Sequence, residues 1–287
     1  MRHAVLGAGG VGAFLGGALA RAGRDVLLLM REDSLARYGG VMHVESVLIG
    51  DFDVALPAAP MLDTPVDVVW VTTKAYELAD ALERVPPDDA IVVPLLNGLD
   101  HVKLLRERYR TVLPASIAVE SERVEPGRVR QLSRFATVVL SPAPRAEELR
   151  AELVDAGLRA SIGTDETSVL WRKLAILAPI GLTTTLRGSS LDGVVADPAW
   201  RKRLRACVRE VVATAAADGV TLDADDIVES IETVPPGLRS SMQKDREAGK
   251  PTELDAIGGS VLRAAARHGL EVPATQALVD GIRAGGP

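Results

Sequence analysis

The glycine-rich stretch from Val5 to Gly12 constrains the fold more than any other feature of the chain. A short apolar run from His3 to Leu6 leads into the pattern Gly7-x-Gly9-x-x-Gly12, and mostly small, helix-compatible residues follow it as far as Ala20. This order predicts a strand, a tight turn and a helix, which is the context that separates a dinucleotide-binding loop from a chance match. A glycine-rich turn that only joins two elements is the alternative, but it does not explain the spacing of all three glycines.

Each glycine in the pattern has a physical reason. Gly7 allows the tight turn out of the strand, Gly9 lets the backbone approach a pyrophosphate, and Gly12 lets the helix pack closely on the strand. The helix N-terminus then offers unpaired N–H groups and a positive dipole end to the phosphates. The loop predicted to bind a dinucleotide is Gly7, Ala8, Gly9, Gly10, Val11 and Gly12.

Length and composition indicate a soluble globular protein. The chain has 287 residues, 47% hydrophobic and 25% charged, which suggests two domains of about 100–200 residues each. The net charge of −6 disfavours nucleic acid as a general partner. No apolar run approaches the roughly 18 residues of a membrane span, and the first apolar run is a strand rather than a signal peptide. We therefore expect a cytoplasmic protein with no membrane partner.

The chain has one cysteine, Cys207, so an internal disulfide is excluded and a reducing compartment fits. We expect Cys207 to be a small buried hydrophobic residue on a helix rather than a nucleophile.

The residues after the second predicted strand, 25–30, bear on the choice of cofactor. Enzymes that use NAD usually place an Asp or Glu there to hold the ribose 2′-hydroxyl. Here Met30 is followed by Arg31, whose planar guanidinium can pair with a 2′-phosphate, and this favours NADPH. Glu32 and Asp33 come just beyond, and either would favour NADH if the loop bent back toward the ribose.

Two further predicted strands, 66–71 and 91–96, lead into polar residues. Lys74 follows the first strand, and Asn97-Gly98 follows the second. Both should therefore lie at the carboxyl edge of a parallel sheet, where doubly wound folds bind ligands. Asn97 could bond the nicotinamide, the ribose or a substrate carbonyl, but it suits a plain turn equally well because Asn-Gly favours turns.

The remaining pattern divides the chain into a mixed half and a helical half. In the first half we expect a turn or hairpin within 40–60, mixed or antiparallel strands at 112–119 and 136–140 around a turn at Pro126-Gly127, and a helix at 145–155. The second half predicts helices at 169–177, kinked at Pro179 if it continues, and at 197–217, 223–231, 240–248, 252–268 and 273–282. Ser240-x-x-Gln243 and Thr252-x-x-Asp255 resemble capping boxes.

The predicted fold is thus α/β, with an N-terminal Rossmann-type doubly wound sheet over residues 1–165 and a C-terminal all-helical domain over residues 166–287. The sequence leaves the oligomeric state open. The apolar helices around 200–217 and 255–268 could form a homodimer interface or simply the core of the helical domain.

Two charged residues of the helical half lie in sequence contexts that could bury them. Lys173 lies within the apolar helical segment 170–177, and Glu253 lies in the first turn of a later helix. Burial would lower the pKa of a lysine and suit it to proton transfer near neutral pH, and a nearby carboxylate would orient it. On composition alone the alternative is favoured, which is a solvated lysine whose stem covers apolar surface.

Several short motifs, taken together, resemble those of one family. They are Gly7-Ala8-Gly9-Gly10-Val11-Gly12, Val71-Thr72-Thr73-Lys74-Ala75, Asn97-Gly98, Trp171-Arg172-Lys173-Leu174 and Ser240-Ser241-Met242-x-x-Asp245-x-x-x-Gly249-Lys250-x-Thr252-Glu253-x-Asp255. Over nearly its whole length the chain thus resembles the ketopantoate reductases (2-dehydropantoate 2-reductases). The last block is the most specific, because its spacing has no generic dinucleotide-fold explanation.

The resemblance implies a Rossmann domain, a helical domain and an active site in the cleft between them. It implies that Lys173 is the catalytic lysine and that Glu253 is the carboxylate that contacts the substrate hydroxyl and the lysine. Ser241 resembles the serine that binds the substrate carboxylate. Lys74 and Asn97 resemble the pair that flanks cofactor and substrate.

The same resemblance makes Arg31 the 2′-phosphate arginine, in line with NADPH. The implied reaction is reduction of a 2-oxo acid by hydride transfer, with Lys173 as general acid and no metal. The substrate would be ketopantoate, giving pantoate, or a related ketone.

One departure from the family pattern concerns the substrate. The family usually carries asparagines four and eight residues after the lysine, and here these positions are Leu177 and Gly181. An apolar side chain cannot replace an amide, and hydrogen-bonding sites discriminate strongly between substrates. A bulkier or less polar 2-oxo acid, or another carbonyl or imine compound, is therefore an alternative substrate. A non-catalytic NADP-binding sensor is a further alternative.

Overall fold

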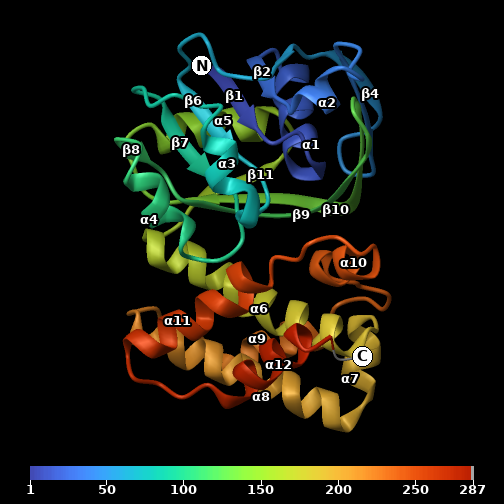
Figure 1. Cartoon of the computed structure of the whole chain (residues 1–287), viewed down its shortest axis with the longest axis vertical. Coiled ribbons are helices and arrows are strands. Elements are labelled where there is room, and N and C mark those ends of the chain that lie inside the picture. Colours follow the sequence, from blue (N-terminus) through green and yellow to red (C-terminus); the bar gives the residue numbers. More distant parts are fainter. Residues whose placement is uncertain (286–287) are drawn as a thin grey trace. The chain divides into compact units, whose positions relative to one another are not determined.

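The computed structural model describes residues 1–285, which divide into two compact units (Figure 1). The first unit comprises residues 1–96 and 101–169, and the second comprises residues 97–100 together with the chain from 170 onward. The division falls inside a long helix rather than at 165. The short segment 97–100, which follows a strand of the first unit, is built into the second.

A six-stranded parallel sheet forms the centre of the first unit. Its order is β5-β2-β1-β6-β7-β8, and every neighbouring pair is parallel. The strands are β1 (Arg2–Leu6), β2 (Asp25–Leu29), β5 (Ala58–Ala59), β6 (Val68–Val71), β7 (Ile91–Pro94) and β8 (Thr111–Val112). This is the strand order of a doubly wound dinucleotide-binding fold, and it confirms the predicted fold class.

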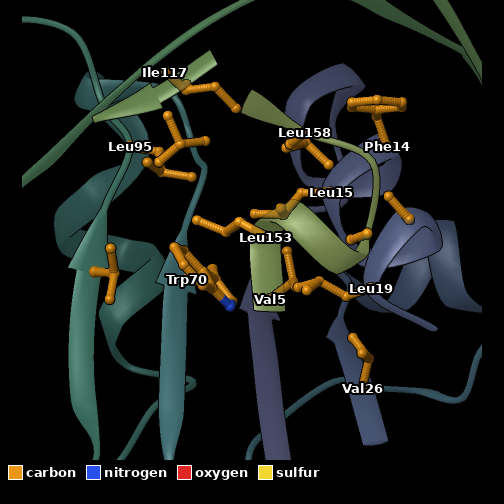
Figure 2. Packing of buried hydrophobic residues seen from close by; sticks show 14 of the residues in the cluster. Val5, Phe14, Leu15, Leu19, Val26, Trp70, Leu95, Ile117, Leu153 and Leu158 are labelled. Atoms are coloured by element: carbon orange, nitrogen blue, oxygen red, sulfur yellow. The ribbon is translucent and has the colours of Figure 1, made fainter. Parts of the chain in front are cut away.

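Both faces of this sheet are buried, which explains why its strands are continuous apolar runs. Side chains alternate along a strand, so Val5 and Trp70 enter one core cluster while Leu6 and Val71 enter another. Figure 2 shows the first cluster, in which strand side chains such as Val5 and Trp70 meet residues of two helices. The helices that cover the sheet are α1 (Gly10–Arg21), α3 (Leu78–Leu82), α4 (His101–Arg106) and α5 (Ala146–Asp155).

A second sheet lies in the same unit, with the order β11-β10-β3-β4 and with β9 paired to β10. Its strands are β3 (Val41–Ser46), β4 (Phe52–Ala55), β9 (Ala115–Glu125), β10 (Arg128–Leu140) and β11 (Arg159–Ile162). The predicted hairpin within 40–60 is β3–β4, and the predicted turn at Pro126-Gly127 joins the antiparallel pair β9–β10. The parallel pairing of β10 with β3 was not predicted, because it joins segments far apart in the chain.

The second unit is helical in its described residues. It contains most of α6 (Glu166–Arg187), then α7 (Leu191–Ala196), α8 (Pro198–Ala217), α9 (Ala224–Glu232), α10 (Ser241–Glu247), the π-helical turn η2 (Asp255–Gly259), α11 (Ser260–Arg267) and α12 (Pro273–Arg283). Most of the predicted helices are present. Across the chain, the short helices α2 (Glu32–Leu35), α3, α4 and α7 and the 3₁₀ turn η1 (Ala75–Glu77) were not predicted.

Helix α6 is the central helix of this unit and continues through Pro179. Its apolar face is Trp171, Leu174, Ala175, Ala178, Leu182 and Leu186, and this face packs in one cluster with residues of α8, α11 and α12. The helix is long and apolar enough to cross a membrane by length and composition, but 78% of its apolar window is buried within the protein. The same test is met by core helices of soluble proteins, and α6 packs as one.

The long helix α8 and the shorter helix α11 contribute their apolar faces to the protein's own core. Cys207 on α8 is fully buried there, and burial raises the pKa of its thiol to about 12. It is therefore the inert core residue that we expected.

The two predicted capping boxes differ in outcome. Ser240 caps α10, since its Oγ accepts the Gln243 backbone N–H at 3.1 Å, while the Gln243 side chain bonds Glu247 instead of reaching back. The second box is wrong, because no side chain caps the turn that starts at Asp255. The Asp255 carboxylate instead accepts a hydrogen bond from Arg263 at 2.8 Å, and this charged partner competes with capping.

Candidate functional site

The glycine-rich loop joins β1 to α1 as predicted. Gly7 has φ +101°, a left-handed conformation that a side chain would strain, and a Cβ there would lie 2.9 Å from Thr73 Cγ2. A Cβ at Gly12 would overlap the carbonyl oxygen of Gly7, so the helix packs on the loop as closely as glycine permits. At Gly9, by contrast, a Cβ would meet no atom within 4 Å. The backbone there faces open space, which suits the approach of a phosphate group.

The loop is tied to the neighbouring strand by a side chain. Thr72, just past the end of β6, donates from Oγ1 to the carbonyl oxygen of Gly7 at 2.7 Å and bonds Leu6 through its backbone. Lys74 follows two residues later, partly buried, as the N-cap of η1. The loop and Lys74 thus lie at the carboxyl ends of two adjacent parallel strands, β1 and β6.

Arg31 lies just past the carboxyl end of the next strand, β2, at the N-cap position of α2, where its side chain makes no capping hydrogen bond. Its side chain is 69% exposed, and Nη2 lies 3.1 Å from Oε1 of Glu77. Arg31 lines a cavity of about 420 Å³ with Met30, Glu32, Asp33, Pro60, Met61 and Arg84. The structure therefore places Glu32 and Asp33 beside the same cavity as Arg31. Arg84 was not predicted from the sequence as a site residue, because no local pattern indicates that it lies beside the residues that follow β2.

The second unit contains the other predicted residues. Lys173 is partly buried on α6, between the core residues Trp171 and Leu174. Burial lowers the pKa of Lys173 to about 8, and the negative charge of Glu253 partly opposes this shift. A lysine with a pKa near 8 can both hold and release a proton close to neutral pH.

Glu253 is buried, with 5% of its surface exposed, and lies just before the π-helical turn η2. Its Oε2 accepts a hydrogen bond of 3.2 Å from Nδ2 of Asn97. The segment 97–100 is further fixed at Gly98, whose φ is +85° and where a Cβ would overlap the carbonyl oxygen of Ala256. Asn97 is therefore more than a turn residue, because its side chain is bonded to the predicted carboxylate. Within the second unit, Glu253 is therefore linked to Asn97 by a hydrogen bond and to Lys173 by electrostatic attraction.

Ser241 is exposed in the first turn of α10, and its neighbour Ser240 is buried and bonded to Thr184 of α6 at 2.8 Å. A second contact joins the same two helices, because a Cβ at Gly181 of α6 would lie 3.4 Å from Cε of Met242 on α10. The positions four and eight residues after Lys173 are thus apolar, since Leu177 packs against the core of the second unit and Gly181 faces the buried side chain of Met242. Among residues 1–285, no group of three or more His, Cys, Asp or Glu side chains could hold a metal ion.

The fold and these residues define a class of protein: a dinucleotide-binding α/β unit joined to a helical unit that carries a buried glutamate and a lysine whose pKa is lowered by burial. Two family models match the chain. The model for ketopantoate reductase PanE/ApbA matches residues 3–145, and the model for its C-terminal part matches residues 166–285. The chain belongs to the ketopantoate reductase family.

Individual relatives are similar to this chain over nearly its full length. The chain is 30% identical to the uncharacterized oxidoreductase YkpB of Bacillus subtilis (strain 168), over 97% of this chain and 96% of that one. It is 29% identical to a 2-dehydropantoate 2-reductase of Caulobacter vibrioides, over 96% of each chain. The crystal structure of 2-dehydropantoate 2-reductase from Geobacter metallireducens superposes with a TM-score of 0.91 at 27% identity, covering 99% of this chain and 100% of the other.

Proposed function

We propose that this protein reduces a 2-oxo acid, or a closely related ketone, with NADPH as the hydride donor. The observation that carries the proposal is the electrostatic and hydrogen-bonded linkage of three side chains in the second unit. The charge of the buried Glu253 acts on Lys173, whose pKa is near 8, and Glu253 is bonded to Asn97, which comes from a segment far away in the chain. Membership of the ketopantoate reductase family supports the reaction class.

Lys173 is the proposed general acid. As an ammonium group it polarises the carbonyl and delivers a proton to the alkoxide that develops on oxygen. A pKa of about 8 keeps Lys173 largely protonated at neutral pH and still able to give the proton up. Desolvation makes this proton easier to release than that of an exposed lysine.

Glu253 is proposed to orient Lys173 or a substrate hydroxyl, and its bond to Asn97 fixes its position. Asn97 and Ser241 are proposed to hold the remaining polar groups of the substrate, with Ser241 on the carboxylate. The exposure of Ser241 leaves its hydroxyl accessible to a ligand.

The cofactor proposal rests on the first unit. The backbone of residues 7–12, with open space at Gly9 and the N-terminus of α1 beside it, suits a pyrophosphate. Lys74 is proposed to lie beside the cofactor, and Arg31 to bind its 2′-phosphate. When bound, NADPH supplies the hydride, while the protein supplies placement and charge.

The identity of the substrate is a separate question, and the apolar positions Leu177 and Gly181 of α6 bear on it. Leu177 and Gly181 offer no amide, so a substrate group that faces them gains no hydrogen bond there. This observation favours a 2-oxo acid that is bulkier or less polar than ketopantoate, or another carbonyl or imine compound on the same scaffold. Ketopantoate stays the reference substrate because the family reduces it.

The experiment is oxidation of NADPH, followed by its absorbance, with ketopantoate and a panel of 2-oxo acids whose side chains grow larger and less polar. Turnover of any 2-oxo acid, abolished by Lys173→Ala, supports the proposal. Tight NADPH binding with no turnover across the panel would contradict it and would favour either a different carbonyl or imine substrate or a non-catalytic sensor. NADH in place of NADPH gives the cofactor preference in the same assay.

A further inference from the structure

Two guanidinium groups line a single cavity in the first unit, although the proposed function uses only one of them. The cavity of about 420 Å³ is formed by Met30, Arg31, Glu32, Asp33, Pro60, Met61 and Arg84. Its volume lies within the range of about 300–1,000 Å³ that is usual for small-molecule sites. It lies beyond the end of β2, where a doubly wound fold receives the adenosine half of a dinucleotide.

Arg84 reaches this cavity from a distant part of the chain. It follows α3, and its backbone is fixed by hydrogen bonds from its N–H to Ala81 and from the N–H of Leu62 to its carbonyl. Its side chain is half-buried, and Nη1 donates to the carbonyl oxygen of Leu29, the last residue of β2, at 3.4 Å. This long bond uses one of five guanidinium donors.

The two arginines are arranged at an electrostatic cost. Burial lowers the pKa of Arg84, and the positive charge of Arg31 lowers it further, with Glu77 partly opposing both. Arg31 is paired with Glu77 at 3.1 Å in an exposed ion pair, which is a weak interaction in water. Two like charges beside one cavity do not stabilise the fold, but they are suited to a dianion bound between them.

We propose that Arg84 and Arg31 together form a two-guanidinium site for a phosphomonoester, the 2′-phosphate of the bound cofactor, so that Arg84 is a second determinant of cofactor choice. The inference rests on the proposed function, since it assumes a dinucleotide in this unit. A phosphomonoester carries close to two negative charges at neutral pH and accepts paired hydrogen bonds from guanidinium groups. Glu77 then acts as the partner that holds Arg31 in place until the phosphate displaces it.

The opposing groups in the cavity are Glu32 and Asp33. They would repel a phosphate, and they would accept hydrogen bonds from the free hydroxyls of an unphosphorylated ribose. The cavity thus contains both side chains that favour a 2′-phosphate and side chains that favour an unphosphorylated ribose.

The test is a calorimetric titration of the full chain with two nucleotides that differ only in the 2′-phosphate, adenosine 2′,5′-bisphosphate and 5′-AMP. We expect the native protein to bind the bisphosphate more tightly. Arg84→Met keeps the apolar stem and removes the charge, and it should weaken the bisphosphate roughly tenfold or more while 5′-AMP changes far less. Arg84→Lys should recover part of the loss, because lysine keeps the charge without the fork.

Arg37→Ala is the matched control, since Arg37 belongs to the same segment as Arg31 but does not line the cavity. It should leave both affinities near their native values. Thermal unfolding of each variant shows that the protein is folded before it is titrated.

The possible results distinguish a failure of the role given to Arg84 from a failure of the proposed preference for NADPH. If the native protein discriminates and Arg31→Ala abolishes this while Arg84→Met does not, the role of Arg84 is overturned and NADPH preference stands. An equal loss of affinity for both nucleotides in Arg84→Met would show that Arg84 lines the cavity without recognising the 2′-phosphate. If the native protein binds 5′-AMP more tightly than the bisphosphate, the proposed preference for NADPH is overturned. That result would favour Glu32 and Asp33 as the residues that bind an unphosphorylated ribose.

Discussion

The side chain of Asn97 donates a hydrogen bond of 3.2 Å to the carboxylate of Glu253, which lies 156 residues later in the chain. The bond is possible because the segment 97–100 belongs to the second unit, although the residues on either side of it belong to the first. Asp100 strengthens the attachment through an ion pair of 2.8 Å with Arg263. The connection after β7 is thus part of the candidate active site and is fixed at both ends.

This attachment predicts the effect of a single methyl group at Gly98. A Cβ there would overlap the carbonyl oxygen of Ala256, and backbone cannot move aside cheaply. Gly98→Ala should displace Asn97 from Glu253 and lower kcat/KM about 100-fold, the size expected for misplacement of an active-site group by about 1 Å. Gly269→Ala is the matched control, since Gly269 also has a positive φ (+66°) but open space around it. Equal losses in both variants would show that backbone strain, and not the contact with Ala256, is responsible.

The pKa of Lys173 predicts how the rate depends on pH. If Lys173 must be protonated to act as the acid, kcat/KM for reduction should be constant below its pKa of about 8 and fall as the pH rises through it. Lys173→Arg should retain little activity, and whatever remains should persist to higher pH, because a guanidinium stays protonated there. A native profile without a basic limb in this region would indicate that another group delivers the proton.

The apolar side chain at Leu177 of α6 predicts how a substitution there would change substrate preference. Leu177→Asn places an amide one helical turn after Lys173, on the same face of the helix. The ratio of kcat/KM for ketopantoate to that for an apolar 2-oxo acid should rise about tenfold, a value typical of one added hydrogen bond to a substrate. Leu177→Met keeps the position apolar and should leave the ratio near its native value. An unchanged ratio in Leu177→Asn would show that the substrate does not face this position.

His3 predicts how the stability of the first unit depends on pH. Its ring is fully buried, Nδ1 accepts the Trp70 indole N–H at 3.1 Å, and Nε2 lies 2.9 Å from the Glu152 carboxylate. Burial lowers the pKa of His3 below 6.5, and Glu152 opposes the shift. The unfolded chain therefore takes up a proton more readily, so stability is full above about pH 6.5 and declines as the pH falls below it. Denaturant unfolding at several pH values should show this decline, and His3→Leu should flatten it. A decline of the same steepness in His3→Leu would assign the effect to other groups.

Local patterns in the sequence were enough for the parts of the fold that depend on neighbouring residues. The spacing of Gly7, Gly9 and Gly12 specifies the loop because the turn conformation at Gly7, the open backbone at Gly9 and the close approach of Gly12 to Gly7 all belong to one strand–turn–helix unit. Apolar runs specify the buried strands for the same reason. The lysine in the apolar segment of α6 was also visible, but residue patterns alone favoured a solvated lysine, and the family resemblance was needed to link Lys173 with Glu253.

What the sequence did not predict depends on contacts between distant segments. Arg84 meets Arg31 only because α3 returns the chain to the end of β2, and β10 pairs with β3 across more than eighty residues. The failed cap at Thr252 has the same origin, since its partner Asp255 is engaged by Arg263 on the next turns of helix. Such competition is decided by tertiary geometry, which local residue preferences do not contain.

The central claim is that Lys173 is the acid of a carbonyl reduction, and the most direct measurement combines turnover and binding in one variant. In Lys173→Ala, the rate of NADPH oxidation with the best 2-oxo acid of the panel should fall by about 10²–10⁴-fold. The affinity for NADPH, titrated on the same preparation, should stay within about twofold of the native value, because the proposed cofactor contacts lie in the first unit. The exposed neighbour Arg172, changed to Ala, should leave both quantities unaffected. A Lys173→Ala variant that still turns over at the native rate would contradict the account.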